Sequence, residues 1–256
     1  MKRLSVLIVI NNEEKQIEEC LKSVKFADEI VVILDRCTDN SEKIVKKYTR
    51  KFFCGKWNIE GKRRNFGISK CSEEWILEID ADERVPKKLS KEILETINSS
   101  DSDWHTIPVK NFIGKKEIVY GWGAYFGKSA YSGLFKRNKK VWGNQRVHPK
   151  IKLVGKEGKK LKNKLHHFYC KSVFDLFVKL DSYSSAKALD LVNYKKSESL
   201  NRNVRRIFSR FWKCFFLRKG YKEKHIGFLI ALVASLYPIF SYLKYKEKND
   251  KGFIYR

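Results

Sequence analysis

The sequence predicts an α/β fold, with a Rossmann-like, mostly parallel sheet flanked by helices and a helical, basic appendage at the C-terminal end. Short β-branched runs alternate with stretches of helical periodicity over residues 1–100. Polar clusters stand directly after several of these runs, where an open α/β sheet binds its ligands. Helical periodicity returns from Phe174, in a segment rich in cationic and aromatic side chains.

Apolar runs predict the strands, and apolar residues at helical spacing predict the helices. Leu4–Ile10 and Glu29–Leu34 are apolar runs that predict strands covered on both faces, and Trp75–Ile79 is a third apolar stretch, which ends in Asp80. Apolar residues at helical spacing predict helices that contain Ile17, Cys20, Leu21 and Val24, then Ile44, Val45 and Tyr48, and finally Leu89, Ile93, Leu94 and Ile97. Strands and helices in alternation imply parallel strands joined by right-handed crossovers.

The composition is that of a folded chain, because 43% of the 256 residues are hydrophobic and 14% are aromatic. The formal net charge of +26 implies an anionic partner, which could be a nucleic acid, an acidic membrane surface or a phosphorylated substrate. The six cysteines form no Cys-x-x-Cys pair and so do not indicate a zinc site. Reduced thiols in a cytosolic or cytosol-facing protein are the simplest interpretation.

Asp80-Ala81-Asp82 is the sharpest candidate for a metal site. Its two carboxylates stand one residue apart, where the third expected strand opens into a loop. Magnesium and manganese ions prefer such oxygen ligands and often share them with substrate phosphates. A solvated acidic turn before a helix is the alternative, and the position at a strand end favours the metal site.

Two further clusters are candidates for nucleotide binding. Asp35 closes the second expected strand and could accept hydrogen bonds from a base or a ribose, although a plain turn before a helix is compatible with the same residues. Lys62, Arg63 and Arg64 lie beside an expected helix N-terminus, which suits a diphosphate. A basic surface helix explains these three cations equally well.

These clusters together resemble the family 2 glycosyltransferases of GT-A fold. Ile8–Glu14 is similar to the first strand and loop of that family, and Asp35–Asp39 to its nucleotide-binding turn. Arg64-Asn65 with Gly67 matches its Arg-Asn element, and Asp80-Ala81-Asp82 its metal motif. The resemblance implies a divalent cation, Mg²⁺ or Mn²⁺, on Asp80 and Asp82. It also implies a nucleotide-sugar site made by Asn12, Glu13, Asp35, Asp39, Arg64, Asn65 and Asp80.

The C-terminal half looks more loosely like enzymes that add sugars to the inner core of lipopolysaccharide, through Phe135-Lys136-Arg137, Val147-His148-Pro149 and His166–Tyr169. Members often have Val-His-Glu, whose glutamate would be a candidate base, and Pro149 stands in that place here. An imidazole can also act as a general base, so His148 is a candidate, although it could instead only position a substrate. Glu117 is the second candidate, because acids are scarce in the middle of the chain.

The resemblance implies an inverting transfer of a hexose, from UDP-hexose, to a lipopolysaccharide-core or other lipid-linked, phosphorylated glycan of the bacterial cell envelope. It implies a GT-A catalytic domain over residues 1–170, with 1–100 for the nucleotide-sugar and 101–170 for the acceptor. The residues of 171–256 themselves predict a helical, membrane-associating region. A basic nucleic-acid-binding protein is one alternative, but no recognisable motif supports it. A nucleotidyltransferase is another, but Asn11–Lys15 lacks the glycine expected of its phosphate loop.

The C-terminal segment predicts contact with a membrane. Ile226–Leu243 carries no formal charge, so a spanning helix has to be considered, but its serine, tyrosine and proline residues argue against one. The stretch before it alternates cations with aromatic rings, which suits the interface of an anionic bilayer. We expect peripheral attachment to the cytoplasmic face of the inner membrane. The alternative is that these apolar residues pack on the catalytic domain.

Overall fold

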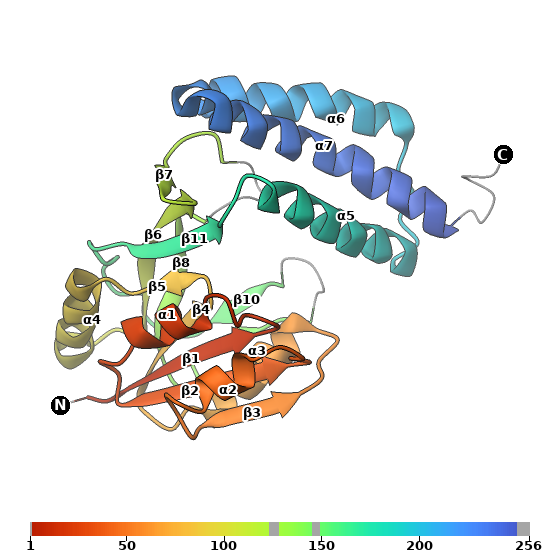
Figure 1. Ribbon diagram of the computed structural model, residues 1–256. Coiled ribbons are helices and arrows are strands. Elements are labelled where there is room, and N and C mark those ends of the chain that lie inside the picture. The colour runs from red at the N-terminus through yellow and green to blue at the C-terminus, as the bar shows by residue number, and fades with distance from the viewer. Residues whose placement is uncertain (1, 123–127, 145–148, 250–256) are drawn as a thin grey trace. The chain divides into compact units, whose positions relative to one another are not determined.

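The computed structural model describes residues 2–122, 128–144 and 149–249 (Figure 1). The chain forms two compact units. Unit 1 consists of Met1–Lys110 and Lys128–His167, and unit 2 consists of Asn111–Gly127 and Phe168–Arg256. The functional division expected at residues 100 and 170 remains a prediction.

Unit 1 contains the parallel sheet that the sequence predicts. Its first four strands lie in the order β3-β2-β1-β4, and all three of their pairings are parallel. They are β1 (Leu4–Ile10), β2 (Glu29–Asp35), β3 (Phe52–Gly55) and β4 (Trp75–Asp80). The register pairs Ile10 with Leu34 and Val9 with Asp80, so the carboxyl ends of β1, β2 and β4 meet at one edge.

The sheet continues with antiparallel strands beyond β4. The order is β4-β8-β6-β11-β5, where β8 pairs antiparallel with both β4 and β6, and β11 pairs antiparallel with β5. These strands are β5 (Glu83–Arg84), β6 (Trp104–Ile113), β8 (Ala130–Lys136) and β11 (Leu165–Cys170). A separate pair is formed by β9 (Lys140–Trp142) and β10 (Ile151–Leu153).

Helices cover both faces of the parallel part of the sheet. Helices α1 (Ile17–Ser23), α2 (Ser41–Val45) and α4 (Lys87–Ser99) bury their apolar residues with one face, and α3 (Glu60–Lys70) packs on the other. Alternate residues of β1 point to opposite faces, so Ile8 joins the first cluster and Leu7 the second. Every residue of β1 is therefore buried, which explains why all are apolar except Ser5, whose hydroxyl donates to the buried carboxylate of Glu29.

Unit 2 is mainly helical. Helix α7 (Lys224–Asn249) packs along α5 (Asp175–Asn193) and α6 (Leu200–Trp212), as Figure 1 shows. A π-helical turn, η1 (Lys213–Leu217), and a 3-10 turn, η2 (Gly220–Glu223), connect α6 to α7, and the short strand β7 (Lys116–Ile118) pairs with the end of β6. The core of the unit joins Leu176, Leu180, Cys214, Ile230, Val233, Ala234 and Tyr237.

Within unit 2, Gly220–Asn249 is long and apolar enough to cross a membrane by length and composition. Half of its most apolar window is buried in the structure. Pro238 lies inside α7 and is itself buried. Core packing therefore accounts for much of the apolar character of this helix.

Candidate functional site

The loops after β1 and β2 are fastened to each other at the carboxyl edge of the sheet. Asn12 has a φ of 55°, a left-handed conformation that asparagine adopts more readily than most residues. Its side-chain oxygen accepts hydrogen bonds from the backbone N–H of Thr38 at 2.7 Å and of Asp39 at 3.3 Å. The N–H of Glu13 donates to the hydroxyl of Ser41 at 2.9 Å. The predicted donor residues Asn12, Glu13 and Asp39 thus lie together.

Asp35 is the buried centre of the nucleotide-binding turn that the sequence predicts. Asp35 is only 2% exposed, and its carboxylate accepts hydrogen bonds from the backbone N–H of Trp57 at 3.0 Å and from Arg63 at 2.9 Å. Arg36, the next residue, donates through Nε to the same carboxylate at 3.0 Å. Two guanidinium groups and a backbone amide thus balance this buried charge. Arg63 links the first turn of α3 to the end of β2.

Arg64 lies among three carboxylates. Its guanidinium donates to Glu60 at 2.8 Å, to Glu78 at 2.9 Å and to Asp80 at 2.8 Å. The guanidinium carbon also lies 4.8 Å from the ring centre of Trp142, within the range of a cation–π contact. Helix α3 therefore delivers one charge to Asp35 through Arg63 and another to Asp80 through Arg64. This geometry makes Arg64 a residue that orients Asp80.

A buried ion pair between Lys140 and Glu78, next to Arg64, was not expected from the sequence. Lys140 on β9 donates to Glu78 at 2.7 Å and to the backbone oxygen of Ser132 at 2.9 Å, and the indole N–H of Trp142 donates to Glu78 at 3.2 Å. Burial alone would raise the pKa of Glu78, but Lys140 and Arg64 lower it below its ordinary value. Glu78 interrupts the apolar run of β4, and a carboxylate in a buried strand needs cationic partners. A glutamate inside an apolar strand was therefore the feature of the sequence that could have indicated this ion pair.

Asn65 holds α3 on β9. Its amide donates to the backbone oxygen of Trp142 at 2.8 Å, and its oxygen accepts from the backbone N–H of Trp142 at 2.9 Å. This two-way pairing fixes the helix that carries Arg63 and Arg64. In this structure, the side chain of Asn65 therefore has a positioning role.

The end of β4 concentrates three carboxylates, Asp80, Asp82 and Glu83. Lys128 lies between two of them, with Nζ 2.7 Å from Glu83 Oε1 and 3.5 Å from Asp80 Oδ2. Burial would raise the pKa of Asp80, but Arg64 and Lys128 hold it well below the usual range of an aspartate. Burial also raises the pKa of Glu83, whose other oxygen accepts the backbone N–H of Asp80 at 2.9 Å. No pattern in the sequence around Lys128 predicted this position.

Asp82 differs from its two neighbours because one of its buried oxygens has neither a hydrogen bond nor an ion pair among the described residues, whereas Glu83 Oε1, which also lacks a hydrogen bond, lies beside Lys128. Oδ2 lies 3.3 Å from Nε2 of His167, whereas Oδ1 is buried without a hydrogen-bond partner among the described residues. A buried carboxylate oxygen of this kind suits a hard cation. Over the described ranges, no group of three or more histidine, cysteine, aspartate or glutamate side chains is arranged to hold a metal ion. Oxygens from a substrate would have to complete such a site.

Neither base candidate belongs to the described part of unit 1. His148 lies outside the described residues. Glu117 lies on β7 in unit 2, where its backbone pairs with Phe112. The base therefore remains a prediction.

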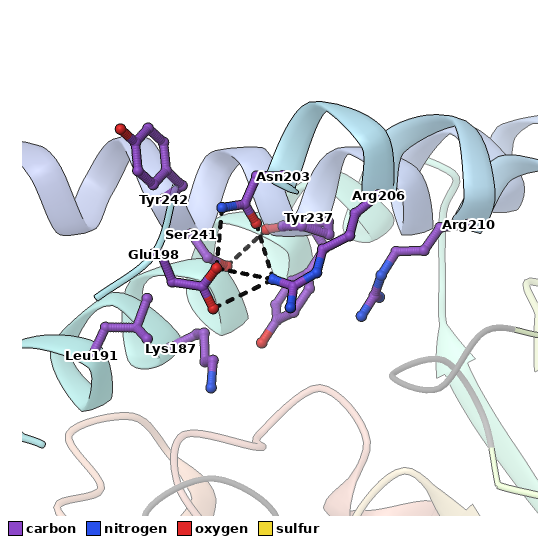
Figure 2. Close-up of a pocket in the computed structure, with 10 residues that line it drawn as sticks. Lys187, Leu191, Glu198, Asn203, Arg206, Arg210, Tyr237, Ser241 and Tyr242 are labelled. Atoms are coloured by element: carbon purple, nitrogen blue, oxygen red, sulfur yellow. Dashed lines mark hydrogen bonds and ion pairs between the residues drawn. The ribbon is translucent and has the colours of Figure 1, made fainter. Parts of the chain in front are cut away.

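Unit 2 has a cavity of its own, of about 170 Å³ (Figure 2). Lys187 from α5 and Arg206 and Arg210 from α6 line it, together with Glu198. Arg206 donates to Glu198 at 3.0 Å and to the side-chain oxygen of Asn203 at 3.2 Å. Three cations against one carboxylate give this cavity a positive character, which the sequence did not reveal because the side chains converge from separate elements.

The known proteins that resemble this chain in sequence are glycosyltransferases. Residues 5–170 match the model of glycosyl transferase family 2. An uncharacterised glycosyltransferase of Rickettsia felis is 28% identical, covering 98% of this chain and 92% of its own. The lipopolysaccharide core biosynthesis glycosyltransferase LpsC of Rhizobium meliloti is 24% identical, covering 96% and 93%.

A solved structure shares the fold. The crystal structure of S. aureus TarS 1-349 in complex with UDP aligns with a TM-score of 0.50 and 16% identity, over 99% of this chain and 93% of that one. The mostly parallel sheet with flanking helices is the GT-A architecture that the sequence predicts, and the C-terminal helices are present as well. The family match covers most of the chain and includes the strand ends that carry Asp35, Asp80 and Asp82. This chain belongs to glycosyl transferase family 2 and is a glycosyltransferase.

Proposed function

We propose that this glycosyltransferase takes a hexose from a nucleotide-sugar, UDP-hexose, and transfers it with inversion to a lipopolysaccharide-core or other lipid-linked, phosphorylated glycan. The observation that carries the donor site is the pairing of two strand-end carboxylates, Asp35 and Asp80, with two successive arginines of α3. The similarity to LpsC over 96% of the chain supports the choice of acceptor.

The donor site would act through residues that are already fixed in place. Asp35 would meet the base or ribose at the end of β2, and Asn12, Glu13 and Asp39 would line the same loops. Arg64 would keep Asp80 turned toward the diphosphate, because three carboxylates hold its guanidinium in one orientation. Such preorganised charge needs little rearrangement during the reaction.

Asp82, with help from Asp80, would hold a divalent cation, Mg²⁺ or Mn²⁺, together with oxygens of the donor. When bound, this cation would supply positive charge against the leaving diphosphate. The buried, unpartnered oxygen of Asp82 fits this role. His148, with Glu117 as second candidate, would take the proton from the acceptor hydroxyl.

Family membership decides against the two alternatives that the sequence left open, a nucleic-acid-binding protein and a nucleotidyltransferase. The enzymatic test is donor hydrolysis and transfer with UDP-glucose, other UDP-sugars and ADP-heptose, in wild type and in Asp82→Asn. We expect a UDP-sugar to be the donor and the variant to lose at least ~100-fold in turnover, since the neutral amide would hold the cation that balances the leaving group's charge less tightly.

Asp101→Asn is a suitable control, because it removes an exposed carboxylate from the same unit. Circular dichroism should give the same spectrum for all three proteins. Full activity of Asp82→Asn, or of the wild type in excess chelator, would show that the metal assignment is wrong. A preference for ADP-heptose would instead redirect the choice of donor.

A further inference from the structure

Helix α6 exposes a row of apolar side chains on its outer surface. Every fourth residue from Leu200 through Val204 and Phe208 to Trp212 is apolar and exposed, and residues four apart lie on the same side of a helix. Phe208 is 72% exposed and Trp212 is 57% exposed. The row continues into η1, where the ring centre of Phe216 lies 4.4 Å from that of Trp212.

This row is separate from the side of α6 and η1 that builds the core of unit 2. Asn203 and Cys214 are buried, and Phe211 and Phe215 pack against the buried cluster that contains Ile230. The exposed row therefore adds nothing to that core. An isolated exposed apolar residue is ordinary, but a continuous row of large ones marks an interaction surface.

The charges beside the row indicate what it binds. From Leu200 to Lys219 the chain has seven cations and no acid, and Arg202, Arg205 and Lys213 belong to this stretch. Aromatic rings flanked by cations are the side chains that settle at the boundary between lipid headgroups and acyl chains. We propose that the outer face of α6 and η1 attaches the protein to an anionic membrane surface, with the helix lying along the interface.

Two other apolar features fit this role less well. Phe174, Phe177 and Val178 near the start of α5 are also exposed, but Asp175 lies between Phe174 and Phe177 and Asp181 follows Val178 by three residues, so an anionic surface would not favour that patch. Helix α7 is the most apolar helix, yet half of its apolar window is already buried in unit 2. Attachment through α6 leaves this packing intact, whereas a span by α7 would break it.

The experiment is sedimentation of the full-length protein with vesicles. One set contains phosphatidylglycerol and phosphatidylcholine in a one-to-three ratio, and the other contains phosphatidylcholine alone. We expect the wild type to pellet with the anionic vesicles and to be released as salt rises. Phe208→Ser/Trp212→Ser should bind at least tenfold more weakly. Arg202→Gln/Arg205→Gln/Lys213→Gln should bind at least tenfold more weakly and depend less on salt than the wild type does, because four cations of the stretch remain.

Phe174→Ser is the matched control, because Phe174 is 71% exposed in the same unit. It should bind vesicles as the wild type does. Circular dichroism on each variant shows whether it is folded, and the readout does not depend on which donor the enzyme uses.

Three results would overturn the proposal. The first is unchanged vesicle binding by the Phe208/Trp212 variant, or an equal loss in Phe174→Ser. The second is a wild type that ignores vesicles and forms a dimer that the Phe208/Trp212 variant breaks, because the row would then bind a second copy of the chain. The third is wild-type protein that only detergent releases, which would indicate a span.

Discussion

Glu29 illustrates, at the scale of a single residue, how a buried charge links stability to pH. Its carboxylate at the start of β2 accepts hydrogen bonds from Lys51, Ser5 and Ser72. Burial alone would raise its pKa, but these hydrogen bonds lower the pKa from an ordinary 4.5 to about 2. A carboxylate whose folded pKa is depressed stabilises the fold above its unfolded pKa, and that contribution is lost as pH falls through the folded pKa.

We therefore expect Glu29→Gln to lower the free energy of unfolding at pH 7 by on the order of 2 kcal/mol. The difference from wild type should shrink between pH 4.5 and pH 2, where the wild-type carboxylate becomes protonated. Urea unfolding at several pH values measures it. Glu95→Gln, at an exposed position on α4, is the control. A difference that stays constant across this pH range would contradict the assignment.

The aspartates of the site could be predicted from the sequence, whereas the lysines that contact the site's glutamates could not. Asp35, Asp80 and Asp82 could be identified because each stands where an apolar run ends, a position that can be read locally. Lys140 and Lys128 could not be identified in this way, because their partners are distant in the sequence. Lys140 lies 62 residues after Glu78, and Lys128 lies 45 residues after Glu83. Asp80 was expected to face a metal ion, and the structure adds that Arg64 and Lys128 already hold it.

At the scale of elements, α3 depends on close contact with β9. Gly61 in its first turn has no room for a side chain, because a Cβ there would lie 1.9 Å from the backbone oxygen of Gly143. A methyl group at this position has to push the helix away from β9. The displacement would disturb the hydrogen bonds between Asn65 and Trp142, and with them the placement of Arg63 and Arg64.

We therefore expect Gly61→Ala to lower the free energy of unfolding by about 1–3 kcal/mol and to weaken UDP binding by about tenfold. Calorimetry with UDP and urea unfolding measure the two effects. Ser69→Ala, on the exposed end of the same helix, should change neither greatly. Normal UDP affinity in Gly61→Ala would mean that the position of α3 is unimportant for the donor.

Elements were predictable where the pattern was long and local. The apolar runs indicated β1, β2 and β4 with nearly their observed bounds, and the periodicity around Ile93 indicated α4. Strand β3 has only four residues and β5 only two, too few for a periodic pattern to emerge. The helix expected to include Tyr48 ends at Val45, because the backbone then tightens into a turn in which the N–H groups of Lys47 and Tyr48 bond the carbonyl oxygens three residues before them.

At the scale of the whole molecule, the net charge of +26 acts against the compact state. Salt screens this repulsion, so the melting temperature at pH 7 should rise by several degrees between about 20 and about 300 mM NaCl, given roughly 2–4 °C per kcal/mol for a chain of this size. The effect should nearly vanish close to the pI of about 9.8. A melting temperature that falls with salt at pH 7 would show that local ion pairs outweigh the net repulsion.

The chain passes between the two units three times, at Lys110–Asn111, Gly127–Lys128 and His167–Phe168. During synthesis, the ribosome therefore releases Asn111–Gly127 well before α5 and α7, which belong to the same unit, have been made. Ile113 and Ile118 have no core to join until then, and β4 also waits for β8 as its neighbour. A gene cut after His167 would not yield unit 1 alone but would leave this inserted segment attached with its apolar side chains uncovered. Deleting it together with the C-terminal helices is the sounder route to an isolated unit 1.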